Sequence, residues 1–196
     1  MENRMYAQML QAARQRLADR QPEEIAANAK VTFDGSGFCF ESLGTSLRVS
    51  YPQWQITPEL APWHQLVILH YLHLADGTPL TGQTVTFAQQ KDGMIRGGGF
   101  DRKAENTISR LDYHRVKACC TALGGRERPS KADYCAELPF LPMYPVTLNY
   151  WQADEEFPAS GRLLTDSSAE HYLTIEDAVT VGELLLERLE GTYGNQ

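Results

Sequence analysis

Residues 30–51 read KVTFDGSGFCFESLGTSLRVSY, and this pattern sets the expected fold class. The segment contains three short runs in which apolar and polar residues alternate: Lys30–Phe33, Phe38–Phe40 and Ser46–Tyr51. Glycine-containing breaks of a few residues separate the runs, as is typical of β-hairpin turns. The pattern predicts an antiparallel meander of three strands.

Helices are predicted on both sides of this meander. Met5–Arg20 has an apolar stripe at helical spacing, and Trp63–Ala75 is apolar on nearly all sides, which indicates a central helix. A further long helix is expected at about Lys103–Leu123. The last helix begins after Thr174, a good N-cap residue with Asp177 at the capping-box position.

The other segments are expected to form short strands and one loop. Strands are predicted at Gln83–Phe87, Met94–Arg96, Val146–Trp151 and Arg162–Thr165, whereas residues 126–145 contain four prolines and are expected to be a structured loop.

Helices and strands therefore occur in groups, which favours an α+β fold with a mainly antiparallel sheet against three long helices. We expect a single domain at residues 30–196, preceded by an N-terminal helical extension at residues 1–29.

Composition narrows the class of function. The chain has 196 residues, 42% of them hydrophobic, and a formal net charge of −7, which is typical of a globular protein and argues against general nucleic-acid binding. The charge is uneven: residues 91–131 carry +5 and residues 132–196 carry −10. Contact between these segments within one fold explains this pattern, and a charged partner surface is the alternative.

The four cysteines form no C-x-x-C motif, so no iron–sulfur or zinc motif is visible. The longest apolar stretch, Leu66–Leu74, is too short to span a bilayer, and no secretory signal is visible at the start. We therefore expect a cytoplasmic protein without a membrane partner.

The glycine-rich segment from Arg96 to Lys103 is a candidate anion site. If Gly97, Gly98 and Gly99 formed a loop between a strand and a helix, their N–H groups could converge on one anion, with Arg96 and Arg102 adding charge. The alternative is a flexible loop with no ligand.

His70 and His73 are the second candidate, because histidines three residues apart on a helix can share a metal or cofactor. The alternative is that His70 is a buried neutral residue with a structural hydrogen bond. Arg115 lies on the apolar side of its helix, where it would pair with the acidic C-terminal segment or bind an anionic ligand.

A third candidate is a group of carboxylates comprising Asp154, Glu156 and Asp166. Such a group can hold a divalent cation or act as general acid and base. The alternative is a solvated turn, since the spacing matches no calcium loop.

Several segments together resemble one protein family. They are Ile68–Leu72, Gly77–Gly82, Val85–Phe87, Leu138–Pro142, Trp151–Ala159, Asp166–Ala169 and Tyr172–Asp177. In this order and spacing they resemble domain of unknown function 3786, over about residues 30–190. The resemblance implies an origin in an anaerobe. It also implies proximity to corrinoid or one-carbon metabolism, because some relatives resemble fusions to a small iron–sulfur domain. This chain lacks the four-cysteine motif of such a domain, so the cluster is not carried over.

These observations favour a non-catalytic accessory protein that binds a small molecule, a corrinoid or another anionic cofactor. The expected pocket lies between the His70 helix and Gly97–Gly99. The alternatives are a small hydrolase or transferase that uses Asp154 and Asp166, and a structural interaction module. The leucine run Leu184–Leu186 leaves a protein partner or a homodimer open.

Overall fold

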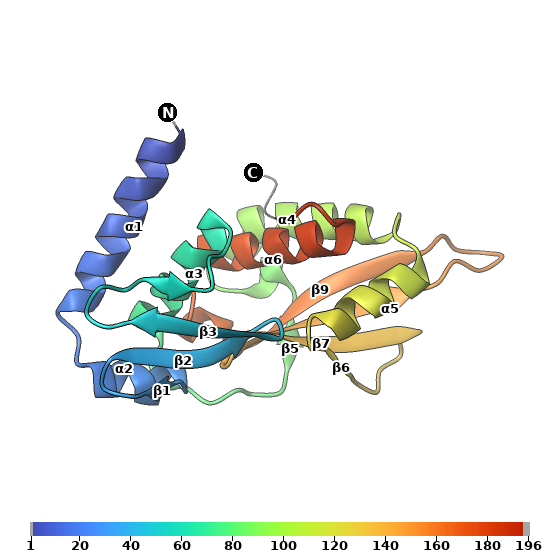
Figure 1. Ribbon diagram of the computed structural model, residues 1–196. Helices are drawn as coiled ribbons and strands as arrows, with labels where there is room; N and C mark the ends of the chain where they lie inside the picture. The colour runs from blue at the N-terminus through green and yellow to red at the C-terminus, as the bar shows by residue number, and fades with distance from the viewer. Residues whose placement is uncertain (1, 194–196) are drawn as a thin grey trace.

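The computed structural model describes residues 2–193 and contains two antiparallel sheets with helices packed against them (Figure 1). The fold class is therefore α+β, as predicted, although the strands form two sheets where one was expected. The first sheet consists, in spatial order, of β1 (Thr32–Phe33), β2 (Gly37–Ser42), β3 (Thr45–Ser50) and β4 (Ile56–Thr57).

The first sheet confirms the predicted meander. Phe38 on β2 pairs with Val49 on β3, and both side chains are fully buried. In the turn between these strands, Leu43 and Gly44 have φ angles of 49° and 72°, as a two-residue type I′ hairpin turn requires. The Leu43 N–H donates to the Pro139 carbonyl at 2.9 Å, so this turn joins the first sheet to the second.

The second sheet has five strands. In spatial order they are β5 (Thr84–Val85), β9 (Ser160–Asp166), β8 (Tyr144–Trp151), β7 (Tyr134–Leu141) and β6 (Arg126–Glu127). The predicted loop at residues 126–145 is therefore wrong, because half of that segment forms β6 and β7 and its last two residues begin β8. Proline has no N–H group to donate to a neighbouring strand. Pro139 is tolerated inside β7 because the register with β8 shifts between Leu138 and Leu141, so the pairing needs no N–H donor at this position.

The glycine-rich segment also differs from the prediction. It forms the first part of α4 (Gly93–Ile108), so Met94–Arg96 is helical and not a strand. A Cβ at Gly97 would lie 2.2 Å from the Phe87 carbonyl oxygen, so only glycine allows α4 to approach the 3-10 helix η1 (Phe87–Gln89) this closely. The carboxylate of Asp101 accepts the N–H groups of η1 residues Phe87 and Ala88 at 3.2 and 2.9 Å. Tertiary packing thus outweighs the low helix propensity of glycine.

The helix predicted at Lys103–Leu123 is divided into α4 and α5 (Tyr113–Ala122). Asp112 begins α5 as its N-cap, and its carboxylate accepts the N–H groups of His114 and Arg115 at 2.9 and 3.1 Å. This cap stabilises a new helix start, so the chain changes direction between the two helices.

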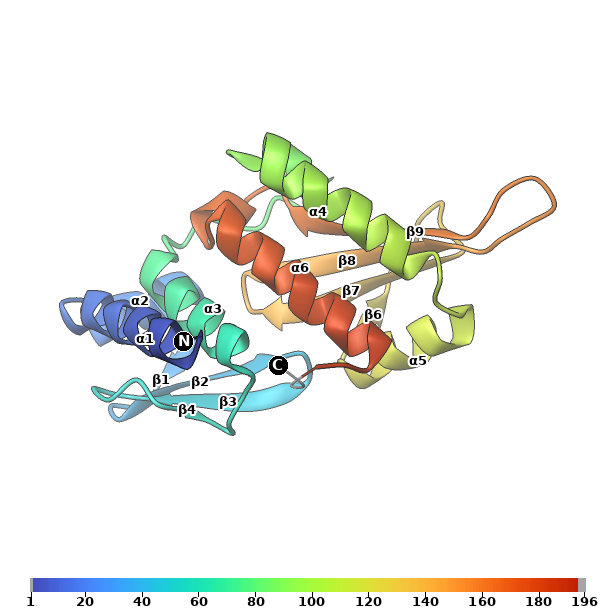
Figure 2. The same ribbon diagram turned by 90° about the horizontal axis from the view of Figure 1, so that it is seen from above.

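Helix α6 (Ile175–Glu190) is central to the molecule. It lies beside α4 across one face of the second sheet, and α3 (Pro62–Leu74) packs against it near the first sheet (Figure 2). A Cβ at Gly182 would lie 2.1 Å from the Phe100 ring, so this glycine permits the close packing of α4 on α6. The α6 N-cap at Thr174 is confirmed by its hydrogen bond from the Asp177 N–H.

The N-terminal segment forms α1 (Glu2–Ala18) and α2 (Pro22–Ala29). Ala13 and Leu17 of α1 are buried, whereas Met5 and Met9 are 54% and 37% exposed. Helix α1 therefore contacts the body mainly through its C-terminal half, and its N-terminal half projects from it (Figure 1). No helix within residues 2–193 is long and apolar enough to cross a lipid bilayer.

Candidate functional site

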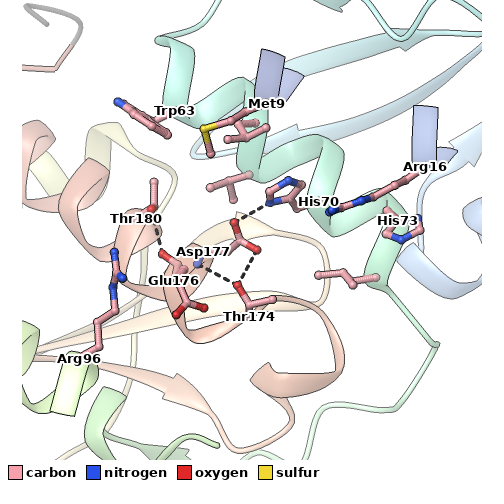
Figure 3. A pocket seen from close by; sticks show the side chains of 13 residues that line it. Met9, Arg16, Trp63, His70, His73, Arg96, Thr174, Glu176, Asp177 and Thr180 are labelled. Atoms are coloured by element: carbon pink, nitrogen blue, oxygen red, sulfur yellow. Dashed lines mark hydrogen bonds and ion pairs between the residues drawn. The ribbon is translucent and has the colours of Figure 1, made fainter. Parts of the chain in front are cut away.

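A cavity of about 400 Å³ lies where four helices meet (Figure 3). Helices α1 and α3 contribute one part of its wall, and the N-terminal parts of α4 and α6 contribute the rest. Its apolar lining consists of Met9, Trp63, Leu66, Val67 and Leu74. Small-molecule sites typically measure about 300–1,000 Å³ and combine an apolar lining with a few polar groups. This cavity has both properties.

The central polar feature of the cavity is a hydrogen-bonded pair from α3 and α6. His70 Nδ1 donates to Asp177 Oδ1 at 2.7 Å, and Asp177 is only 7% exposed. The other oxygen of this carboxylate, Oδ2, accepts the hydroxyl of Thr174 at 2.9 Å. Thr174 also caps α6, so the helix start holds the carboxylate, and the carboxylate in turn orients the imidazole.

The second ring nitrogen of His70, Nε2, makes no hydrogen bond to any described residue. Because Nδ1 carries the proton shared with Asp177, a neutral His70 has its lone pair on Nε2. That nitrogen can accept a hydrogen bond, take up a proton or bind a metal. The expected structural hydrogen bond of His70 is present at Nδ1, which bonds Asp177. The other ring nitrogen, Nε2, has no such bond to a described residue.

His73 and Arg16 lie at the same end of the cavity as His70 (Figure 3). Burial lowers the pKa of His73, and the positive charges of Arg20 and Arg16 lower it further. Its Nδ1 is shielded from solvent and has no hydrogen-bond partner within residues 4–193. Arg16 itself makes no ion pair with a described acidic residue.

Arg96 reaches the cavity from the first turn of α4, near Glu176 and Thr180 of α6 (Figure 3). It therefore lines the same cavity as His70. The predicted anion loop beside it is wrong, because Gly97, Gly98 and Gly99 lie inside α4 and their N–H groups belong to a regular helix. Gly97 allows η1 to pack closely against α4, and the three glycines do not form a loop that could bind an anion.

Two other arginines lie away from the cavity. Arg102 lines a separate hollow of about 160 Å³ with Asp101 and Arg162. Arg115 donates from Nε to the Leu189 carbonyl at 3.0 Å and from its terminal nitrogen to the Glu190 carbonyl. It thereby satisfies free carbonyl groups at the C-terminus of α6, which is a structural role.

The carboxylates predicted as a metal or acid–base group are not brought together. Asp154 and Glu156 lie in the loop before β9 and Asp166 is its last residue, so the strand of roughly 20 Å separates them. Asp154 accepts the N–H groups of Glu156 and Phe157 at 2.8 and 2.7 Å, as in a solvated turn. Within the described chain, no group of three or more His, Cys, Asp or Glu residues has metal-binding geometry.

Asp166 is a structural junction. Its buried carboxylate accepts hydrogen bonds from Thr81, Gly82 and Ser168, including the three N–H groups at 2.8–3.0 Å. Burial raises the pKa of Asp166, but the hydrogen bonds from Thr81 and Ser168 outweigh it and leave the pKa below its usual value. The hydrogen bonds from Thr81 and Gly82 join two segments that carry part of the family resemblance, Gly77–Gly82 and Asp166–Ala169. The contact between the two segments therefore stabilises the fold.

The cavity is too small to enclose a corrinoid. A corrin ring with its amide side chains is larger than a drug-sized molecule, whereas about 400 Å³ lies near the lower end of the range for such ligands. His70 Nε2 has the right chemistry for an axial ligand, but the surrounding space cannot enclose the macrocycle.

Sequence reasoning identified His70, His73 and Arg96 but missed Asp177 as the partner of His70. The two residues are 107 positions apart, so no local pattern connects them. One signal was present: Asp177 precedes buried Val181 by four residues and therefore shares its inward helix face. An acidic residue on such a face requires a partner.

Comparison with known protein families matches residues 21–188 to the family described as Domain of unknown function (DUF3786). No curated protein and no solved structure matches the chain. The matched residues include His70, Arg96 and Asp177, whereas Met9 and Arg16 of α1 precede them. Since the match covers most of the chain, the protein belongs to the DUF3786 family.

Proposed function

We propose that this protein binds a small organic molecule in the cavity, with the imidazole of His70 as the polar anchor. The supporting observation is the His70–Asp177 pair: a buried carboxylate orients the ring, and Nε2 has no partner in the described chain. His70 lines the cavity and 20% of its side chain is exposed, so a ligand in the cavity can reach this nitrogen. A ligand that donates to Nε2 would complete this network.

The apolar lining of the cavity indicates the chemical character of the part of the ligand that does not contact His70. Trp63 is half-buried, and Leu66 and Val67 are 3% and 1% exposed, so they form a firm apolar wall. Such a wall favours an aliphatic or aromatic body of modest size. The proposal keeps the ligand-binding expectation from the sequence and replaces the corrinoid with a smaller molecule.

Binding without catalysis is supported by the other side chains at the cavity. No Ser, Cys or Lys is among the described residues that line it. The two hydroxyl groups present already donate, from Thr174 to Asp177 and from Thr180 to the Glu176 carbonyl. No hydroxyl, thiol or amine among the described lining residues is therefore free to act as a nucleophile.

A second candidate function is general-base catalysis by His70. The same geometry favours it, because a carboxylate on Nδ1 holds the tautomer in which Nε2 can accept a proton. In this case His70 would take a proton from water or from the bound molecule, and Asp177 would stabilise the imidazolium. The discriminating measurement is the mass and the proton NMR spectrum of the recovered ligand before and after incubation with the protein in heavy water. Binding alone leaves both unchanged, whereas proton abstraction from the ligand introduces deuterium and addition of water raises the mass.

The test of the binding proposal is native mass spectrometry of the protein purified from its own host without oxygen. His70→Ala is the test variant. His171→Ala is a matched control, because His171 Nδ1 also bonds a carboxylate, that of Asp76, at 2.7 Å but does not line the cavity. We expect additional mass on the native protein and the control, and its loss from His70→Ala. Bare protein in all three samples, or additional mass retained by His70→Ala, would contradict the proposal.

A further inference from the structure

We propose that Arg16 binds a carboxylate on the ligand, so that the cavity selects a small monocarboxylic acid with an apolar body. This inference rests on the proposed binding function of the cavity and names its ligand class. It assigns the selectivity for charge to α1, which precedes the residues that match the family.

The first observation is the position of Arg16. It lines the cavity, and its guanidinium group extends from α1 toward His70 (Figure 3). The neighbouring Arg20 already has partners, because it donates to Glu24 at 2.6 Å and to the His73 carbonyl. Arg16 has no such partner among the described acidic residues. Its five N–H donors match the two oxygens of a carboxylate.

The second observation is the electrostatic balance at this end of the cavity. The carboxylate of Asp177 accepts hydrogen bonds from His70 and Thr174 and makes no ion pair with Arg16. His73 is neutral at physiological pH because burial lowers its pKa, and the Nδ1 atom of its ring is shielded and lacks a partner. Arg96 lies at the other end of the cavity near Glu176 (Figure 3). The charge of Arg16 beside the neutral His73 suits a single carboxylate better than a doubly charged phosphate.

The third observation is that α1 is attached firmly enough to place Arg16. Leu17, the next residue, is completely buried, and Ala13 is 1% exposed. Tyr6 contacts the Trp63 ring of α3 with the ring centroids 6.0 Å apart. Arg16 therefore projects from the anchored half of α1, directly beside the apolar wall that would hold the ligand body.

The experiment uses matched probes, 3-phenylpropionate and 3-phenylpropanol, which share the apolar body and differ in the charged group. Affinities are measured on the full chain by NMR chemical-shift titration. The variants are Arg16→Gln and the control Arg4→Gln, which removes an exposed arginine of α1 that does not line the cavity.

We expect the native protein and Arg4→Gln to bind the acid about tenfold more tightly than the alcohol, which corresponds to about 1.4 kcal/mol. Arg16→Gln should lose this preference while its affinity for the alcohol stays unchanged. Equal affinities of the native protein for both probes would overturn the inference, as would an equal loss in Arg4→Gln.

The outcomes also separate this inference from the proposed function. If both probes bind at the cavity and His70→Ala weakens both, but Arg16→Gln changes neither, the binding site stands and the selectivity is refuted. If neither probe shifts the resonances of cavity residues, both proposals fail.

Discussion

Two His–Asp pairs with the same bond length have different surroundings. His70 Nδ1 lies 2.7 Å from Asp177, and His171 Nδ1 lies 2.7 Å from Asp76. The side chains of the first pair are 20% and 10% exposed, whereas those of the second are 39% and 50% exposed. The first pair lines a cavity, and Nε2 of its histidine has no partner among residues 4–193. The second pair fastens a surface turn.

The difference shows that the pair by itself does not define a site. Asp76 also accepts the Thr78 N–H at 2.9 Å, and Thr78 Oγ1 lies 3.1 Å from His171, so all of these groups hold one turn together. Water competes for hydrogen bonds at this exposed position, which makes each contact weak. The Asp177 side chain is only 10% exposed, so water replaces a missing partner there less readily and the loss costs more.

The largest effect is expected from Asp177→Ala. Removing this carboxylate leaves His70 Nδ1 and the Thr174 hydroxyl without their acceptor, so the free energy of unfolding should fall by about 2–3 kcal/mol. Asp76→Ala should cost less than about 1 kcal/mol, since its partners turn to water. Urea denaturation measures both. Equal losses in the two variants would remove the distinction between the pairs.

A smaller effect is expected from Thr174→Ala, which removes both the α6 cap and one hydrogen bond to Asp177. The loss of a threonine cap costs about 1 kcal/mol. Thr174→Ser keeps the hydroxyl and should retain most of the stability, which isolates the role of the oxygen. Thermal unfolding of both variants provides the measurement, and similar losses in the two would show that the methyl group matters more than the cap.

The smallest effect is the pH dependence of the surface pair. The hydrogen bond from His171 lowers the pKa of Asp76 from 3.8 to about 2, and the Thr78 N–H contributes to the shift. A lowered carboxylate pKa stabilises the fold above the unfolded value and loses this effect as the pH falls through the folded value. The native protein should therefore exceed Asp76→Asn in stability by less than about 1 kcal/mol at pH 5.

This advantage should disappear as the pH falls from about 4 to about 2. Denaturation at a series of pH values tests it. An advantage that grows toward low pH would contradict the assigned direction of the shift.

Local sequence signals predicted the elements whose start, end or turn is specified by residues close together in the sequence. The β2–β3 hairpin follows from alternation around a short turn, and α6 follows from its cap at Thr174 and its apolar stripe. Long-range contacts decided the other elements. Pro139 lies in a strand because a bulge accommodates it, and Gly97 lies in a helix because η1 presses against its backbone.

The candidate site divides in the same way. The sequence by itself determined that α3 is a central helix carrying His70 and His73, because hydrophobic periodicity and residue type are local properties. It also determined Thr174 as the cap of α6. Only the tertiary structure decided that Asp177 meets His70, that Arg16 and Arg96 reach the same cavity, and that Asp154 and Asp166 lie apart. These relations depend on how helices and strands distant in the chain pack together, which no short-range pattern records.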